Sequence, residues 1–305
     1  MYVIYPKPQK MILRDGQFHL NHNTVFFAQK MENVCQELNS TMKFELEDEI
    51  SSQICFKIKE QLKQQAYEIE VTEKGITVYA SEEVGFYYAV KTLKQMLSEH
   101  MRNVYVYDEP DLLTRGFMLD ISRNKVPTVK TVKEIIDIMS DLKMNHLELY
   151  VEGFSFEYKS FAKFLEDESY ITVAEYQELE KYANSKYIDL VPNQNGFGHM
   201  TEWLKKDEFK DLAESPDGIF LWGNHRAPST LNPLDPRSIE LVKKMYADMI
   251  PYTNSKYFNM NFDEPFELGK GKSKQACEEE GIANVYLDYT LKAYNEIKKY
   301  NKTPL

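Results

Sequence analysis

The chain has 305 residues, of which 43% are apolar and 28% are charged, with only twelve glycines and twelve prolines. This composition excludes disordered, collagen-like and low-complexity proteins, and the length allows two or three domains. The 48 acidic and 37 basic residues give a net charge of −11 without a compensating basic stripe, so nucleic acid is not expected as a partner.

Membrane and secretion signals are not apparent in the sequence. No uncharged stretch approaches the roughly 20 residues that span a bilayer, and the first residues lack the charged and apolar regions of a signal peptide. The three cysteines are far apart and odd in number, which fits reduced thiols better than a disulfide framework. We therefore expect a cytoplasmic protein without membrane contact.

Residues 1–110 combine short strand patterns with helical ones and are expected to form a small α+β domain. Polar and apolar residues alternate over 67–71 and again over 75–80, and the short segment between them fits a hairpin connection. Apolar residues then recur at helical spacing over 81–97.

From Arg115 onward, strand and helix patterns alternate. Strands are predicted over 116–121, 146–151, 188–192 and 256–262, and helices over 128–143, 172–186, 199–213, 237–250 and 283–300. Such alternation implies a parallel sheet with right-handed crossovers, so residues 111–305 are expected to form an α/β domain. A complete (β/α)8 barrel has eight strands and typically about 250 residues. The pattern therefore allows either another α/β fold or a chain that stops half way round a barrel.

The fourth predicted strand carries the strongest candidate site. Period-two alternation puts Asn259, Asn261 and Asp263 on one face and apolar residues on the other. In a barrel the polar face would point inward, and Asp263 and Glu264 would lie at the carboxyl end of the strand, where barrel enzymes place catalytic groups. A polar loop start is the commoner explanation of such a dipeptide, but the two asparagines beneath it weigh against that explanation.

Two other strand ends also carry polar groups. The third strand is followed by a segment with two glycines, three carboxamides including Asn195, and His199, while the second strand ends at Glu152. A solvated loop is the simpler interpretation of each. Arg115 opens the first strand, where its side chain could reach a deep pocket or pair with an interior carboxylate. No motif typical of zinc proteases, α/β-hydrolases or dinucleotide-binding proteins occurs.

Five motifs, in order along the chain, together resemble glycoside hydrolase family 20, the β-N-acetylhexosaminidases, and are most similar to its smaller, signal-less bacterial-type branch. They are Arg115-Gly-Phe-Met-Leu-Asp-Ile-Ser-Arg123 with the helix that follows it, Asn145-His-Leu-Glu-Leu-Tyr150, Phe197-Gly-His-Met200, Asn261-Phe-Asp-Glu264 and Leu268-Gly-Lys-Gly-Lys-Ser273. The match covers residues 115–305, and residues 1–110 resemble the α+β domain that precedes the barrel in that family.

The resemblance implies retaining hydrolysis of terminal β-linked N-acetylglucosamine or N-acetylgalactosamine, in which the 2-acetamido oxygen of the substrate attacks C1. It implies that Glu264 protonates the leaving oxygen, while Asp263 orients the acetamido nitrogen and stabilises the oxazolinium charge. No metal or cofactor is implied. The candidate substrate-binding residues are Arg115, which would hold the 3- and 4-hydroxyls of the sugar, His199 and Glu152, which would support the acid, and Asn195.

The sequence departs from the family pattern in three places. Asn259-Met-Asn-Phe replaces the common His-x-Gly-Gly before Asp263, and Glu152 stands where an aspartate is usual. The aromatic cage around the acetamido group and the tyrosine that aligns its oxygen come from the fifth to eighth strands in the family, and these residues lack those strands.

We therefore expect either a fragment of a longer enzyme or a half-barrel whose open face and unpaired fourth strand are covered by a second copy in a homodimer. The 305 residues alone are expected to have little or no hydrolase activity. One alternative is a non-catalytic half-barrel that binds sugar or serves as a scaffold. Another is a glycosidase with a conventional carboxylate nucleophile.

Overall fold

The computed structural model describes residues 2–305, which form two compact units. The first unit contains the residues up to Arg115 together with 137–145 and 185–187, and the second contains 116–136, 146–184 and 188–305. The division thus falls at Arg115 rather than at residue 110. Within residues 2–305, every helix is too short or too polar to cross a bilayer.

The first unit is built on a seven-stranded sheet with the strand order β1-β7-β5-β6-β4-β2-β3. The predicted hairpin is confirmed, since β5 and β6 pair antiparallel from Tyr67 opposite Ala80 to Thr72 opposite Gly75. The strands are β1 (Lys10–His19), β2 (Thr24–Phe27), β3 (Glu45–Leu46), β4 (Ile54–Ile58), β5 (Tyr67–Thr72), β6 (Gly75–Ala80) and β7 (His100–Asp108).

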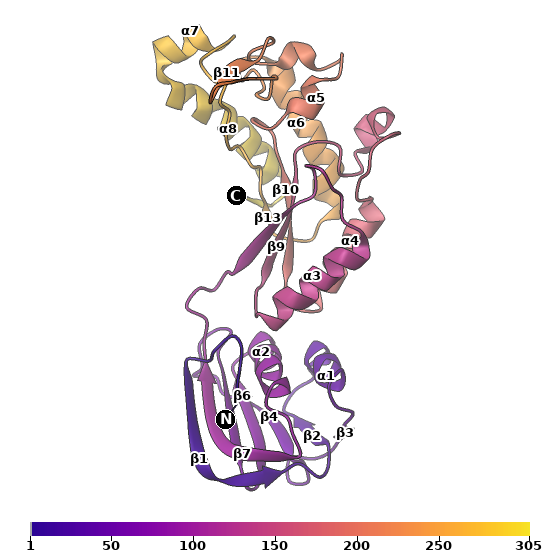
Figure 1. Ribbon diagram of the computed structural model, residues 1–305, viewed down its shortest axis with the longest axis vertical. Helices are drawn as coiled ribbons and strands as arrows, with labels where there is room; N and C mark the ends of the chain where they lie inside the picture. Colours follow the sequence, from indigo (N-terminus) through magenta and orange to yellow (C-terminus); the bar gives the residue numbers. More distant parts are fainter. Residues whose placement is uncertain (1) are drawn as a thin grey trace. The chain divides into compact units, whose positions relative to one another are not determined.

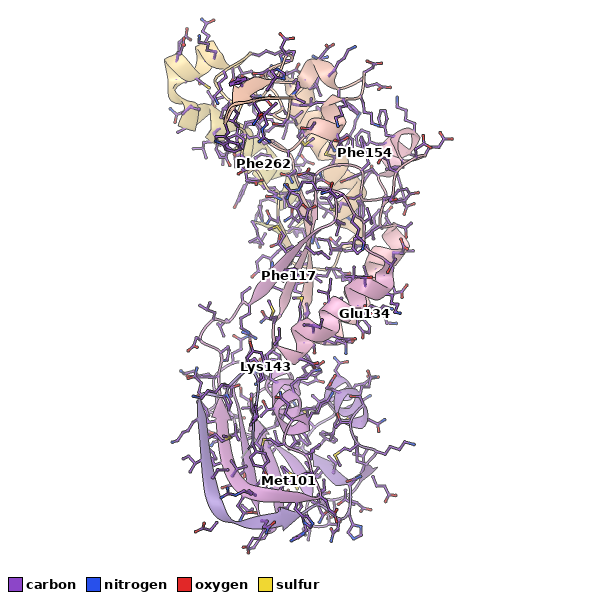
Figure 2. The ribbon with its side chains drawn as sticks, in the orientation of Figure 1. Met101, Phe117, Glu134, Lys143, Phe154 and Phe262 are labelled. Atoms are coloured by element: carbon purple, nitrogen blue, oxygen red, sulfur yellow. The ribbon has the colours of Figure 1, made fainter. Side chains whose placement is uncertain are left out.

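Two helices, α1 (Glu32–Asn39) and α2 (Glu83–Lys94), cover one side of this sheet (Figure 1). Buried apolar residues alternate with half-buried residues along β5 and β6, so one face of the hairpin packs into the core. Met101 on β7 is fully buried in the same core (Figure 2). The first unit is therefore an α+β domain, as expected.

The second unit alternates parallel strands with helices, as the sequence predicts. β8 (Gly116–Asp120), β9 (His146–Val151) and β10 (Asp189–Gln194) pair in parallel in that order. A bridge between Asn193 and Asn259 adds β13 (Tyr257–Phe258), which pairs in parallel with β14 (Thr303–Pro304). The remaining elements are most of α3 (Val129–Asp141), η1 (Lys159–Phe164), α4 (Val173–Asn184), α5 (Thr201–Leu204), η2 (Lys210–Leu212), β11 (Ile219–Leu221), β12 (Asn224–Arg226), α6 (Pro236–Met249), η3 (Ile250–Tyr252), α7 (Lys274–Ala276), η4 (Cys277–Gly281) and α8 (Ile282–Lys299).

The fourth strand differs from its prediction in length and in its neighbour. β13 is much shorter than the predicted strand over 256–262, and within that range Asn261 has φ +46, outside the extended region. The expected unpaired edge is wrong for this strand. β14 lies beside it, and the N–H of Leu305 donates to the carbonyl of Phe258 at 2.9 Å.

The second unit exposes apolar side chains on its first strand and its last helix. Phe117 and Met118 on β8 are 44% and 47% exposed, and Figure 2 labels Phe117. On α8, Leu287, Leu291 and Tyr294 are exposed at helical spacing on one face. An apolar stripe of this kind is typical of a surface that another protein segment covers.

A buried ion-pair cluster joins α1 and α2 in the first unit. The carboxylate of Glu37, 8% exposed, accepts hydrogen bonds from the ammonium groups of Lys91 and Lys94 and from the hydroxyl of Tyr87. Lys91 is 4% exposed and also pairs with Asp141 at 2.9 Å. Burial alone would raise the pKa of Glu37, but the hydrogen bonds from Lys91 and Lys94 outweigh burial and lower it to about 2.

We predict that Glu37→Gln destabilises the first unit by on the order of 3 kcal/mol at pH 7, because it leaves the buried Lys91 without its main partner. Since the folded-state pKa lies below the ordinary 4.5, this carboxylate stabilises the fold above pH 4.5 and loses that effect as the pH falls toward 2. Urea denaturation followed by circular dichroism should therefore show a difference between wild type and variant that shrinks over this range.

Glu134→Gln is the matched control. Glu134, labelled in Figure 2, is 61% exposed and lies 3.9 Å from Lys130, so its removal should change stability little at any pH. An equal loss of stability in both variants would contradict the role given to Glu37.

Candidate functional site

His199 lies among three carboxylates at the carboxyl ends of the strands of the second unit. Its Nε2 atom is 3.3 Å from Asp263 Oδ2 and 3.3 Å from Glu264 Oε2, while its Nδ1 atom is 3.2 Å from Glu152 Oε2. His199 and Glu152 are mostly buried, whereas the side chains of Asp263 and Glu264 are 49% and 52% exposed. The structure therefore brings together these four of the six residues proposed from the sequence, and Asn195 joins them through Asp263.

The carboxylates determine the charge of this imidazole. Asp263 and then Glu152 raise the pKa of His199 to about 10, against the opposing effect of burial. The raised pKa favours the protonated imidazole at neutral pH, and its Nε2 atom lies equally close to Asp263 and Glu264.

The same cluster contains side chains of the types that bind metal ions. His199, Asp263 and Glu264 offer ligand atoms that lie within 4.8 Å of one another. A metal ion would bind a deprotonated imidazole, so metal binding and protonation would exclude each other at the nitrogen concerned.

Backbone geometry fixes the two segments that carry these side chains. A Cβ atom on Gly198 would lie 2.3 Å from the carbonyl oxygen of Asp263 and 2.9 Å from that of Glu264, so only glycine fits there. His199 and Glu264 have φ values of +56 and +50, which non-glycine residues rarely adopt. Unusual backbone conformations of this kind are typical of functional sites.

Glu152 is held by residues that the sequence analysis did not select. Tyr150 donates its hydroxyl to Glu152 Oε2 at 2.8 Å, and the backbone N–H of Glu152 donates to Ser122 Oγ at 2.9 Å. Arg123 lies 3.8 Å from the same carboxylate oxygen. The sequence could have indicated Tyr150. Period-two alternation puts it on the same face of the second strand as Glu148 and Glu152.

Beneath the cluster, Glu148 on β9 is the acceptor at the centre of a polar network. Its carboxylate accepts hydrogen bonds from Asn193 Nδ2 at 2.6 Å, Asn259 Nδ2 at 2.8 Å and His146 Nε2 at 2.7 Å. Burial would raise the pKa of Glu148, but these three donors lower it. Asn259 and Asn261 are the two asparagines predicted to face the interior. Asn259 donates directly to Glu148, and Asn261 joins the network through Asn193 and Asn259.

Asn261 and Asn195 connect that network to Asp263. Asn261 donates its side-chain amide to Asn193 Oδ1 at 2.8 Å and its backbone N–H to Asn259 Oδ1 at 2.9 Å. With the amide oriented to satisfy its neighbours, Asn195 donates to Asp263 Oδ1 at 3.2 Å and to the carbonyl of Asn261 at 2.8 Å. Asn195 is fully buried, so this geometry makes it a support for Asp263, and its contact with substrate stays a prediction.

The structure places Arg115 in the first unit. Its guanidinium donates to the carbonyls of Leu112, Leu113 and Lys143 at 2.6 to 3.2 Å and to the hydroxyl of Tyr88 at 3.1 Å. These bonds use all three guanidinium nitrogens on partners within that unit. The predicted role of Arg115 toward a sugar stays a prediction.

Comparisons with known proteins identify relatives of both units. The model of the glycosyl hydrolase family 20 catalytic domain matches residues 114–303, and that of glycosyl hydrolase family 20 domain 2 matches residues 1–116. A β-hexosaminidase of Vibrio furnissii is 25% identical over 303 residues, covering 86% of this chain and 48% of the relative. A lacto-N-biosidase of Bifidobacterium bifidum is 24% identical over 211 residues, covering 68% of this chain and 18% of the relative.

A solved structure has a closely similar fold. The GH20 exo-β-N-acetylglucosaminidase from Vibrio harveyi in complex with N-acetylglucosamine superposes with a TM-score of 0.83 at 21% identity, covering 100% of this chain and 55% of that chain. The chain therefore spans about half the length of this solved structure. It spans half or less of the length of each of the two curated relatives.

We predict that His199 titrates near pH 10 in the folded protein, which NMR of the imidazole nitrogens can measure. Asp263→Asn and Glu152→Gln should each move this pKa back toward the ordinary 6.5. Because the folded-state pKa is raised, His199 contributes stability that is fully present below pH 6.5 and is lost as the pH rises through about 10. Titration of His199 near pH 6.5 in the wild type would refute the proposed charge arrangement.

We also predict that Gly198→Ala displaces the segment of Asp263 and Glu264, because the added methyl group meets backbone oxygens that cannot move independently. The variant should lose about 1–3 kcal/mol of stability, and the pKa of His199 should fall. Gly153→Ala is the matched control, since its Cβ would lie 3.5 Å from the side chain of Glu202, an ordinary contact. Equal behaviour of the two alanine variants in urea denaturation and NMR would show that the Gly198 contact is unimportant.

Proposed function

Since the chain belongs to glycosyl hydrolase family 20, we propose that its second unit carries the catalytic residues of a β-N-acetylhexosaminidase acting by substrate assistance. The family resemblance found in the sequence is confirmed by both family models, and the chain is a glycoside hydrolase by family. The observation that carries the proposal is the cluster in which Asp263 and Glu264 both lie 3.3 Å from the Nε2 atom of His199.

In the proposed reaction the acetamido oxygen of the substrate attacks C1 as the bond from C1 to the leaving oxygen breaks. Glu264 gives its proton to the leaving oxygen, and an oxazolinium ion forms on the sugar. Water then attacks C1, the carboxylate of Glu264 takes a proton from that water, and the acetamido group is restored. Retention of the anomeric configuration follows from the two successive displacements.

Asp263 is suited to orienting the acetamido nitrogen. Its Oδ1 atom accepts from the buried Asn195 amide, and its Oδ2 atom faces the His199 imidazolium, so the carboxylate is held on two sides. A fixed anion at this place would stabilise positive charge as it develops on the oxazolinium ring. The side chain of Glu264 is 52% exposed, which fits a group that must reach the leaving oxygen of the substrate. The main chain of the preceding residue, Asp263, packs closely against Gly198.

Because the chain spans at most about half of the relatives described above, the substrate and the complete pocket are proposals as well. We propose a terminal N-acetylhexosamine of an oligosaccharide or glycoconjugate as substrate. The exposed apolar residues of β8 and α8 support a further protein surface, from a second copy or from additional chain, that covers the open side of the second unit. The cytoplasmic location stays a prediction.

We predict that Glu264→Gln lowers hydrolysis of an aryl N-acetyl-β-glucosaminide by about 10²–10⁴-fold, because general acid catalysis is lost. Because these 305 residues alone are expected to have little or no activity, the assay uses a full-length version of the enzyme, with Glu240→Gln as a control. Glu240 is 61% exposed on α6 in the same unit, and its removal should leave turnover unchanged. Unchanged turnover in Glu264→Gln would remove this residue from the mechanism.

A second experiment separates the hydrolase from a non-catalytic scaffold. Calorimetric titration with N-acetylglucosamine-thiazoline, a mimic of the oxazolinium intermediate, should show binding that Asp263→Asn weakens at least tenfold, since the variant removes the anion that faces the ring. A well-folded chain that does not bind the mimic would favour the scaffold. Activity on substrates without a 2-acetamido group would favour a conventional carboxylate nucleophile.

A further inference from the structure

Tyr150 is a buried side chain of the candidate site for which the proposed reaction gives no role. It is the last residue but one of β9, where its main chain pairs with Asn193 on β10 and with Asp120 on β8. It is 5% exposed. Neighbouring strands thus hold its main chain on both sides, so the position of its side chain is set by the sheet rather than by a loop.

The hydroxyl of Tyr150 has one proton and two acceptors within reach. It donates to Glu152 Oε2 at 2.8 Å, and it lies 2.9 Å from the side-chain oxygen of Asn195 when that amide is oriented to satisfy its neighbours. Burial, Glu152 and Asp263 raise the pKa of Tyr150, so the hydroxyl keeps its proton at neutral pH. It is therefore a donor for which two groups of the site compete.

These two acceptors belong to different parts of the site. Glu152 Oε2 is also the atom that lies 3.2 Å from His199 Nδ1, whereas Asn195 donates to Asp263 Oδ1 at 3.2 Å. When the hydroxyl donates to Glu152, two donors share one acceptor atom, so this oxygen attracts the imidazole less strongly than it would alone. Tyr150 thus connects the carboxylate that faces the imidazole with the amide that holds Asp263.

The ring of Tyr150 has contacts of its own that do not involve the hydroxyl. The guanidinium of Arg123 lies 5.2 Å from the ring centroid, and the imidazole of His199 meets the ring at 81°, with centroids 6.3 Å apart. A phenylalanine ring can make the same contacts. Tyr150→Phe is therefore the substitution that removes the hydroxyl and leaves the packing of the ring in place.

We propose that Tyr150 is a positioning residue that acts through Glu152: its hydroxyl shares Glu152 Oε2 with His199 and so sets how strongly this carboxylate holds the imidazole. Arg123, after β8, lies 3.8 Å from the same oxygen. The charged groups that face His199 itself are those of Glu152, Asp263 and Glu264. A weaker hold by Glu152 leaves more of the positive charge of His199 to the other two, which the proposed reaction uses. This inference therefore rests on the proposed function.

A double-mutant cycle, followed by NMR of the His199 imidazole nitrogens, tests this role in the 305 residues without turnover. Tyr150→Phe should raise the pKa of His199 further above 10, because Glu152 Oε2 then accepts from the imidazole without a competing hydroxyl. In the Glu152→Gln background, Tyr150→Phe should leave this pKa unchanged, since the group through which it acts is gone. Tyr176→Phe is the matched control. Tyr176 is 3% exposed in the same unit and donates its hydroxyl to the carbonyl of Leu190 at 3.2 Å, so its loss should not affect His199.

Kinetics of a full-length version of the enzyme provide the second readout. Tyr150→Phe should lower kcat about tenfold, the loss expected when one hydrogen bond to a charged group is removed. KM should change by less than about twofold, because the hydroxyl proton is bound by groups of the protein and not by the substrate. Tyr176→Phe should change neither constant.

The outcomes separate this inference from the proposed function. An unchanged or lowered pKa of His199 in Tyr150→Phe overturns the role of Tyr150 and leaves the hydrolase standing, and so does a raised pKa with unchanged kcat. An equal pKa change in the wild-type and Glu152→Gln backgrounds would show a general effect on the fold and would also overturn that role. Absence of hydrolysis by the wild-type full-length enzyme overturns the proposed function, whereas a pKa change that requires Glu152 still supports the action of Tyr150 through this carboxylate.

Discussion

The polar interior of the second unit depends on one buried carboxylate, Glu148. A buried charge is tolerated only when its hydrogen-bonding capacity is filled, and here the donors come from β9, from β10 and from the residue after β13. The carboxylate therefore fixes the mutual positions of three chain segments that are far apart in the sequence. Asn193 in turn accepts a hydrogen bond from Asn261. Asn195 binds the carbonyl of Asn261 and the carboxylate of Asp263, so the network extends to the candidate site.

Above this network, the site combines clustered carboxyl groups with unusual backbone conformations. Three carboxyl groups surround one imidazole, that of His199, and two of them, Asp263 and Glu152, raise its pKa. His199, Asn261 and Glu264 all have positive φ values, and none of them is glycine. Three of the nine non-glycine residues with positive φ among residues 2–305 thus lie where the chemistry is proposed. Such conformations are common in enzymes because packing elsewhere supplies the compensation.

Local pattern predicted much of this structure and failed where distant residues decide the outcome. Period-two alternation predicted β5, β6 and the inward face of Asn259 and Asn261, because burial of one face is a local property. The motif order predicted that Glu152, His199, Asp263 and Glu264 would meet. The left-handed conformation of Asn261 was not predicted, since the side chain of this residue is bound by Asn193, which lies about seventy positions away. The buried carboxylates of Glu214 and Glu267 were missed for the same reason, because they accept from backbone N–H groups and serine hydroxyls of distant residues, which no local pattern reveals.

The contact at Gly198 separates the architecture of the site from its reactivity. The glycine meets the main-chain oxygens of Asp263 and Glu264, which every amino acid possesses, and leaves their side chains outside the contact. Replacing either carboxylate by its amide therefore preserves the main-chain surface on which that segment rests. Chemically silent forms of the protein should accordingly keep the path of that segment, which suits them to trapping intact sugar complexes for crystallography.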